Sequence, residues 1–232
     1  MERKRGEMEK GKSEVRLAME ELSCFSLGDG EEEQVQVQVQ VQEKQRSSTM
    51  DLICVSKQLI HVLDEIGPTL LVLSQDIQQN VQRLQDMHAR DTSKYTSLTA
   101  IVTEEAEEGT SKKINSCTRA IIWLSRSINF SKYLLEKLLK TPELSLEEIV
   151  EEAYESTLKP WHGWISKAAY KVALKLVPER EVLIALLMGN CHDLEDLAED
   201  VKMLTTVVQP LLEEVDAILV RAKHNLEKLK SS

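Results

Sequence analysis

Residues 48–68, STMDLICVSKQLIHVLDEIGP, decide the fold class of this chain. Their apolar side chains recur every three or four positions, which is the repeat of one face of an α-helix. These positions are Leu52, Val55, Leu59, Val62, Leu63 and Ile66. Ser48 and Thr49 can cap the start of such a helix, and the pair Gly67-Pro68 interrupts it. The stretch therefore predicts an amphipathic helix that buries one face.

The same spacing continues to the C-terminus. It predicts further helices over residues 68–89, 94–105, 111–140, 145–157, 160–176, 179–188 and 194–229. Ser145 and Glu148 have the spacing of a capping box at the start of one of them, and Pro210 is expected to kink or divide the last. No strand pattern follows residue 47, and neither a heptad nor a solenoid repeat persists. We expect residues 48–232 to form one all-α domain.

The first 47 residues differ in composition from the rest. They contain Gly28-Asp29-Gly30, three consecutive glutamates and four Val-Gln repeats over residues 35–42. Strict alternation is a strand pattern, but acidic residues flank the repeat and no other strand is available to pair with it. We therefore interpret residues 1–47 as a disordered, low-complexity N-terminal arm, within which a short helix around residues 13–25 is allowed.

The composition excludes some classes of partner. The chain has 39 acidic and 29 basic residues and a formal net charge of -10, which argues against binding to nucleic acid. Its four cysteines lie far apart without a CxxC pair, and its start is charged rather than apolar, so we expect a reduced, cytosolic protein. The apolar runs are too short to span a membrane, and any membrane contact is expected to be peripheral.

Sequence signatures of common enzymes are missing. The eight glycines are scattered and form no phosphate-binding loop, and neither a GxSxG elbow nor an HExxH motif is present. An acidic cluster at residues 192–199 could approach a cation, but acids at the start of a helix explain it better. We expect no catalytic residue, no cofactor and no metal site.

One short segment carries side chains suited to ligand binding. Residues 159–164 read Lys-Pro-Trp-His-Gly-Trp and place Trp161 and Trp164 on either side of His162. Tryptophan offers a broad amphipathic surface, and a neutral imidazole can both donate and accept a hydrogen bond. A histidine that is satisfied within the core is the alternative interpretation of His162.

Two helices supply the other candidates. Asp76, Asn80 and Arg83 are spaced to share one face of a helix. An acceptor, an amide and a cation together suit a polyhydroxylated head group, although a solvated polar face is the simpler alternative. Trp123 can be a core residue, but Arg119 lies one turn earlier and would need a partner beside a core ring. Stacking against a sugar or anchoring a phosphate would use both.

From residue 48 to the end, the chain resembles the glycolipid transfer protein family. The motifs follow the family's order: DIQQNVQR at 76–83 is similar to its DxxxNxxK segment, and WLSR at 123–126 to its WLxR segment. AYE at 153–155, followed by WHGWI at 161–165, is similar to its AYE…HGWI segment. Tyr95, Leu98 and Ile101 resemble an apolar helix of the family, and Pro178 falls where the family ends a helix.

This resemblance implies a fold of helices in two layers, with a lipid held in a cleft between them. It implies a nonenzymatic function, in which the protein transfers sphingolipids between membranes or senses them. Glycosylceramides are the sphingolipids that the resemblance favours. Its partners would be that lipid and a membrane surface, which it would contact transiently from the cytosol through Trp164 and Trp161. We expect it to act as a monomer.

The resemblance also assigns roles to the other candidates. Asp76 would accept a hydrogen bond from the ceramide amide N–H, and His162 would donate one to the amide carbonyl. Asn80 and Arg83 would bind sugar hydroxyls. Trp123 would be the flat platform beneath the sugar ring.

Two positions depart from the glycolipid-selective pattern. Arg83 replaces the usual lysine, which keeps the cation but changes its geometry. Arg119 stands where glycolipid-selective members are apolar and the ceramide-1-phosphate branch has arginine. That branch also has lysine in place of Asn80 and a second arginine in place of Trp123. Two of these three positions therefore favour a sugar. A ceramide-1-phosphate carrier, and a helical adaptor that has lost its lipid, are the alternatives.

Overall fold

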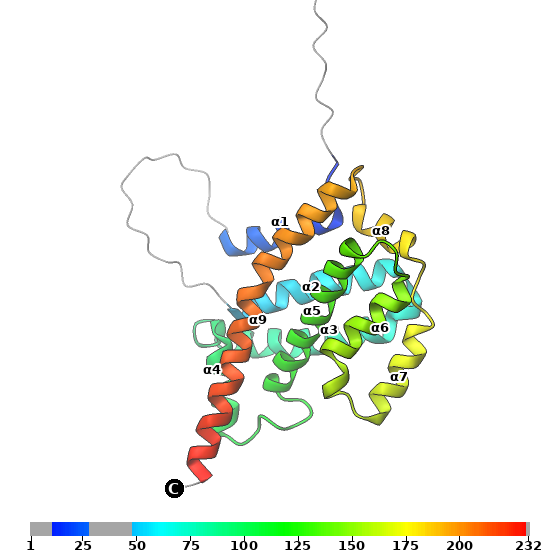
Figure 1. The fold of residues 1–232 in the computed structure, drawn as a ribbon. Helices are drawn as coiled ribbons and strands as arrows, with labels where there is room; N and C mark the ends of the chain where they lie inside the picture. The colour runs from blue at the N-terminus through cyan, green and yellow to red at the C-terminus, as the bar shows by residue number, and fades with distance from the viewer. Residues whose placement is uncertain (1–10, 28–47, 231–232) are drawn as a thin grey trace, which may run out of the picture.

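The computed structural model describes residues 11–27 and 48–230, and every regular element within them is helical (Figure 1). The α-helices are α1 (Glu14–Leu27), α2 (Ser48–Ile66), α3 (Leu71–Arg90), α4 (Leu98–Glu107), α5 (Cys117–Lys140), α6 (Leu146–Thr157), α7 (Trp164–Leu174), α8 (Arg180–Met188) and α9 (Leu194–Lys230). Short 3-10 helices precede α3, α4 and α7, and they are η1 (Pro68–Leu70), η2 (Lys94–Thr96) and η3 (Lys159–Trp161). No described helix combines the length and the low charge that a membrane crossing requires. The all-α expectation is confirmed within these ranges.

Helix α5 forms the centre of the fold. It packs against α2, α3, α4, α6 and α9. Its sequence explains this position, because apolar and small residues return every three or four positions and bury one side of a 24-residue helix. Helices α6 and α7 lie on one side of α5, and α4 and α9 lie on the other (Figure 1).

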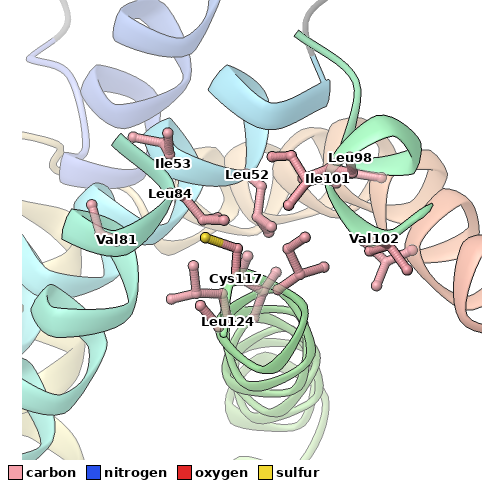
Figure 2. Close-up of a cluster of buried hydrophobic side chains, with 14 of the residues drawn as sticks. Leu52, Ile53, Val81, Leu84, Leu98, Ile101, Val102, Cys117 and Leu124 are labelled. Carbon is pink, nitrogen blue, oxygen red and sulfur yellow. The ribbon is translucent and has the colours of Figure 1, made fainter. Parts of the chain in front are cut away.

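The larger apolar cluster joins α2, α3, α4, the first half of α5 and the middle of α9. Figure 2 shows Leu52, Leu84 and Cys117 converging from three helices, with Leu98 and Ile101 of α4 beside them. Each fully buried leucine or isoleucine stabilises the fold by about 1.5–3 kcal/mol. The cluster holds α3 against α5, and these two helices carry most of the candidate binding residues.

A second apolar cluster joins the end of α5 to α6, α8 and the start of α9, and α1 contributes Val15 to it. Ser13, just before α1, donates a hydrogen bond to Asp200 of α9, with 2.5 Å between Oγ and Oδ2. Arg16 pairs with the same carboxylate at 2.7 Å. Helix α1 is therefore part of the fold, and it lies where the sequence allows a short helix within the N-terminal arm. The Val-Gln repeat of the arm lies outside the described residues.

Three helix boundaries differ from the sequence-based expectation. Helix α5 begins at Cys117 rather than at residue 111. Pro160 lies within η3, and α7 begins only at Trp164. Pro210 does not divide the last helix, because α9 runs without interruption across it.

Two helix starts agree with the sequence. At α6, the Ser145 side chain accepts from the Glu148 N–H at 3.3 Å and the Glu148 carboxylate accepts from the Ser145 N–H at 2.9 Å, which confirms the capping box. At α9, the Asp193 carboxylate accepts from the Glu195 N–H at 2.9 Å. The acidic cluster at residues 192–199 therefore serves a helix start, as its composition indicates.

Candidate functional site

The polar edge of α3 carries three of the predicted binding residues. The buried side of this helix includes Ile77, Val81, Leu84 and Met87. Asn80 lies at the border of that side and is only 5% exposed. Its Nδ2 donates to the backbone carbonyl of Asp76 at 3.0 Å, and its Oδ1 accepts from Nη1 of Arg83 at 2.8 Å. The structure thus brings Asn80 and Arg83 into direct contact, with the Asp76 side chain exposed one turn earlier.

Arg83 also lines a polar pocket of about 310 Å³ between α3, α4 and the start of α5. The other charged residues of its lining are Asp86, Arg90, Glu104, Glu105, Glu108 and Lys113. Cations and carboxylates therefore lie side by side in this pocket. A surface of this kind can donate and accept hydrogen bonds at once, which suits a ligand rich in hydroxyl groups.

Trp123 and Arg119 lie one turn apart on α5 but differ in their surroundings. Ser116 caps the helix by accepting from the Arg119 N–H at 3.1 Å, so Arg119 lies in the first turn. Its side chain is exposed and is solvated there, so it needs no partner within the core. Trp123 is half-buried, and its indole faces the His162 imidazole with 5.5 Å between the ring centroids and 43° between the planes.

His162 lies in an extended turn between η3 and α7, with φ of -85° and ψ of 128°. Pro160 occupies the first turn of η3, where its missing N–H costs no helical hydrogen bond, and Gly163 precedes α7. The imidazole packs between the rings of Trp123 and Tyr154, with 5.5 Å to each ring centroid. The turn therefore places His162 against an aromatic ring from α5 and another from α6.

The surroundings of His162 favour the neutral imidazole. Burial, and then the positive charges of Arg126 and Lys167, hold the pKa of His162 below its ordinary value. Its Nδ1 is buried and has no hydrogen-bond partner among the described residues. A neutral imidazole can donate from one nitrogen and accept at the other, so Nδ1 can take one hydrogen bond with a ligand.

The Arg126 side chain contacts the rings of both Trp123 and Trp161. Its guanidinium lies 5.0 Å from the ring centroid of Trp123 and 4.0 Å from that of Trp161, within the range of cation–π contacts. Trp161 is still 57% exposed, and Trp164, the first residue of α7, is 80% exposed. Sequence reasoning quoted Arg126 only as part of a motif. Its position three residues after Trp123, on the same helical face, was the available signal.

Tyr154 of α6 and Tyr170 of α7 continue the aromatic row beyond His162. Their rings stack with 3.5 Å between centroids and 6° between planes. Both hydroxyls are buried without a hydrogen-bond partner among the described residues. Tyr154 entered the sequence reasoning only through the AYE motif, and Tyr170 not at all. Spacing within α7 does not single out Tyr170, because its half-buried position is visible only in the structure.

Four of the predicted residues pair with one another, and the other four are exposed. Asn80 contacts Arg83 on α3. Trp123 of α5 contacts His162. The remaining predicted residues are exposed and lie near one of these pairs along the chain; they are Asp76, Arg119, Trp161 and Trp164.

Comparison with known proteins gives one family. The family model described as glycolipid transfer protein (GLTP) matches residues 47–189. Glycolipid transfer protein 2 of Arabidopsis thaliana is 39% identical, over 100% of this chain and 100% of its own length. Glycolipid transfer protein 1 of the same organism is 30% identical over 61% of this chain and 70% of its own length.

Solved structures share the fold. The GLTP-fold structure of FAPP2, described as selecting simple glycosphingolipids, matches with a TM-score of 0.67 and 24% identity, over 82% of this chain and 90% of that one. A mutant of Arabidopsis ACD11 complexed with C12 ceramide-1-phosphate matches with a TM-score of 0.69 and 16% identity, over 91% and 96% of the two chains. These likenesses confirm the expected fold.

Proposed function

We propose that this chain, which belongs to the glycolipid transfer protein family, carries sphingolipids between membranes without changing them, and that its preferred cargo is a glycosylceramide. The family consists of lipid transfer proteins and not of enzymes. The 39% identical relative is named a glycolipid transfer protein, whereas the ACD11 mutant was solved with ceramide-1-phosphate. A sphingolipid cargo is consistent with both of these proteins, so the choice of head group depends on the residues of this chain.

The contact between buried Asn80 and half-buried Arg83, beside the polar pocket, is the observation that favours a sugar. One guanidinium N–H is used by Asn80, and arginine has four more donors. Asn80 keeps one amide N–H and one lone pair for a ligand hydroxyl. The pocket lining holds three basic and four acidic side chains, so its net charge gives no advantage to an anionic head group. Sugar hydroxyls, which donate and accept, match this surface.

The ceramide would be held at the junction of α3, α5 and α7. Asp76 offers an exposed carboxylate one turn before Asn80, and we assign it to the amide N–H. Neutral His162 offers Nδ1, and we assign it to the amide carbonyl. The half-buried indole of Trp123 would lie beneath the sugar ring.

Membrane contact would be made by η3 and α7, from the cytosol and by a monomer. Trp161 and Trp164 expose large aromatic surfaces there, and α7 contains no acidic residue while it carries Lys167 and Lys171. A surface with exposed aromatic rings and lysines is typical of helices that lie at a membrane interface. Each methylene of the lipid chains gains about 0.8 kcal/mol from leaving water, whether in the bilayer or in the protein. Transfer is therefore reversible, and polar contacts provide the specificity.

Variants of the two key residues test this proposal. Asp76→Val removes a charged hydrogen-bond acceptor that contributes about 1.5–3 kcal/mol, and Trp123→Ala removes the surface beneath the sugar ring. Each is therefore expected to reduce the transfer of labelled glucosylceramide between vesicles at least about tenfold. The measurement is the rate at which fluorescence-labelled glucosylceramide leaves donor vesicles.

Glu199→Val is the matched control, because it makes a similar change on an exposed face of α9. Thermal unfolding followed by circular dichroism shows whether each variant is folded. The site assignment would be contradicted if folded Asp76→Val and Trp123→Ala proteins transferred the lipid at the wild-type rate.

Ceramide-1-phosphate is the second candidate cargo, and Arg119 is the observation that favours it. Its guanidinium is exposed one turn before Trp123, where it could reach a phosphate that replaces the sugar. Arg119 does not line the polar pocket, and it stands alone among the positions that favour this branch. We therefore place the sugar first.

A further inference from the structure

Three polar atoms along one aromatic row are buried without a hydrogen-bond partner among the described residues. They are Nδ1 of His162 and the hydroxyl oxygens of Tyr154 and Tyr170. The row is continuous, with 5.5 Å between the ring centroids of His162 and Tyr154 and 3.5 Å between those of Tyr154 and Tyr170. Buried polar groups are normally paired, because an unmet hydrogen bond costs free energy. Three such atoms on a row of contacting rings point to a ligand with several polar groups.

The two tyrosines are better placed for a ligand than for a structural contact. Tyr154 is only 4% exposed, yet its hydroxyl bonds no described residue. The rings lie face to face at 6°, an arrangement that aromatic pairs disfavour relative to offset or edge-to-face packing. Tyr170 belongs to α7, in which no side chain is fully buried. Separating the two rings to admit a ligand group between α6 and α7 therefore costs little free energy.

Both hydroxyls stay protonated at neutral pH. Burial raises the pKa of Tyr154, and burial followed by the charge of Glu151 raises the pKa of Tyr170 to about 12. Each tyrosine can therefore donate one hydrogen bond and accept another. A hydroxyl on the ligand is the natural partner, because it has the same capacity.

An ordinary ceramide has too few polar groups near its amide to meet all the hydrogen-bonding capacity of His162, Tyr154 and Tyr170. Near its amide it carries the amide N–H, the amide carbonyl and one hydroxyl on C3 of the long-chain base. With Asp76 on the N–H and His162 on the carbonyl, the C3 hydroxyl can donate to one tyrosine and accept from the other. The O–H of the first tyrosine and a lone pair of the second would stay buried without a partner, and a second hydroxyl could meet both.

We propose, on the basis of the proposed function, that Tyr154 and Tyr170 recognise a second hydroxyl next to the ceramide amide, so that the protein prefers hydroxylated ceramides. This hydroxyl lies either on C4 of the long-chain base or on C2 of the acyl chain. Both positions are within a few bonds of the amide that His162 would bind, and the contact between the His162 and Tyr154 rings places the tyrosines beside it.

A competition between three glucosylceramides of equal chain length tests the proposal. One carries no extra hydroxyl, one carries it on C4 of the base, and one carries it on C2 of the acyl chain. The protein is incubated with vesicles that hold equal amounts of all three, and native mass spectrometry measures which lipid is bound. We expect wild-type protein to favour one hydroxylated lipid by about two- to tenfold, the effect of one hydrogen bond.

Tyrosine-to-phenylalanine variants identify the residues, because each removes only an oxygen atom. Tyr154→Phe and Tyr170→Phe are expected to shift the ratio of the bound lipids toward equal occupancy, and this ratio is read from whatever lipid each variant holds. Tyr133→Phe is the matched control, because the Tyr133 hydroxyl bonds Glu152 at 2.7 Å, outside the row, and it should keep the preference.

The outcomes separate this inference from the function on which it rests. Equal occupancy by the three lipids in wild-type protein, or an unchanged preference in both phenylalanine variants, would overturn the inference and leave glycosylceramide transfer intact. Absence of any bound glucosylceramide from the wild-type protein would overturn the proposed cargo, and the inference with it.

Discussion

His162 is a single residue whose ionisation can be followed directly. Burial and the nearby cations hold its pKa below the ordinary value of 6.5, near which the imidazole of the unfolded chain titrates. Below pH 6.5 the unfolded state therefore binds a proton that the folded state does not. The stability linked to His162 is full above pH 6.5, and it is lost as the pH falls through the folded pKa.

Two measurements check this prediction. In a nuclear magnetic resonance titration, the imidazole signal of His162 should have its midpoint below pH 6.5. In urea unfolding at pH 7.5 and pH 5.5, wild-type protein should lose more stability on acidification than His162→Gln, which has no titrating group there. A midpoint at or above 6.5, or equal losses in the two proteins, would show that His162 is not held neutral.

For single residues, sequence and structure agree where all the interacting side chains lie on one helix. The α3 spacing predicts that Asn80 and Arg83 share a face, and their hydrogen bond confirms it. Arg126, Tyr154 and Tyr170 are different, because their contacts run between elements, from α5 to η3 and from α6 to α7. Spacing within a helix does not indicate which faces of separate helices meet. The motifs contained two of these residues, and the structure was needed to show what they touch.

Among the helices, the start of α5 depends on a carboxylate from α4. Glu105, 9% exposed, accepts from the N–H groups of Cys117 and Thr118, each at 2.7 Å. The first N–H groups of a helix have no partner within it, and a negative charge there also favours the helix dipole. Glu105→Gln replaces one acceptor oxygen by an NH₂ group that cannot accept. It is expected to lower the free energy of unfolding by about 1.5–3 kcal/mol.

Urea denaturation of wild-type protein and two variants measures this effect. Glu107→Gln is the control, because Glu107 lies on the same helix and is exposed. It should stay within about 0.5 kcal/mol of wild type, as surface changes usually do. If Glu105→Gln behaved like this control, the start of α5 would not depend on the buried carboxylate.

The same contact explains why one helix boundary was predicted wrongly. The sequence allowed a helix from residue 111, because nothing near that position breaks the pattern. The structure starts α5 at Cys117, where Ser116 and the distant Glu105 together satisfy the first N–H groups. The capping box of Ser145 was predicted correctly because both partners are local. Pro210 does not divide α9, since a proline inside a helix removes only one hydrogen-bond donor and packing can hold the rest together.

In the N-terminal region, the sequence allowed a helix but did not indicate that this helix packs into the fold. Helix α1 looks weak as an isolated segment, because little in its own sequence indicates what it would pack against. Its anchors, Asp200 and the apolar cluster beneath Val15, lie far along the chain. The all-α class, by contrast, rests on repeats within each helix, and it was predictable throughout.

The central claim is that the whole chain acts as a sphingolipid carrier selective for a sugar head group. A head-group competition tests it most directly: vesicles carry equal amounts of glucosylceramide, ceramide-1-phosphate and phosphatidylcholine with matched labels, and the transfer rate of each is measured with and without protein. We predict that the protein accelerates glucosylceramide most, ceramide-1-phosphate less and phosphatidylcholine least. Faster transfer of ceramide-1-phosphate that Arg119→Leu abolishes would contradict the sugar assignment, and no acceleration of either sphingolipid would contradict the carrier function itself.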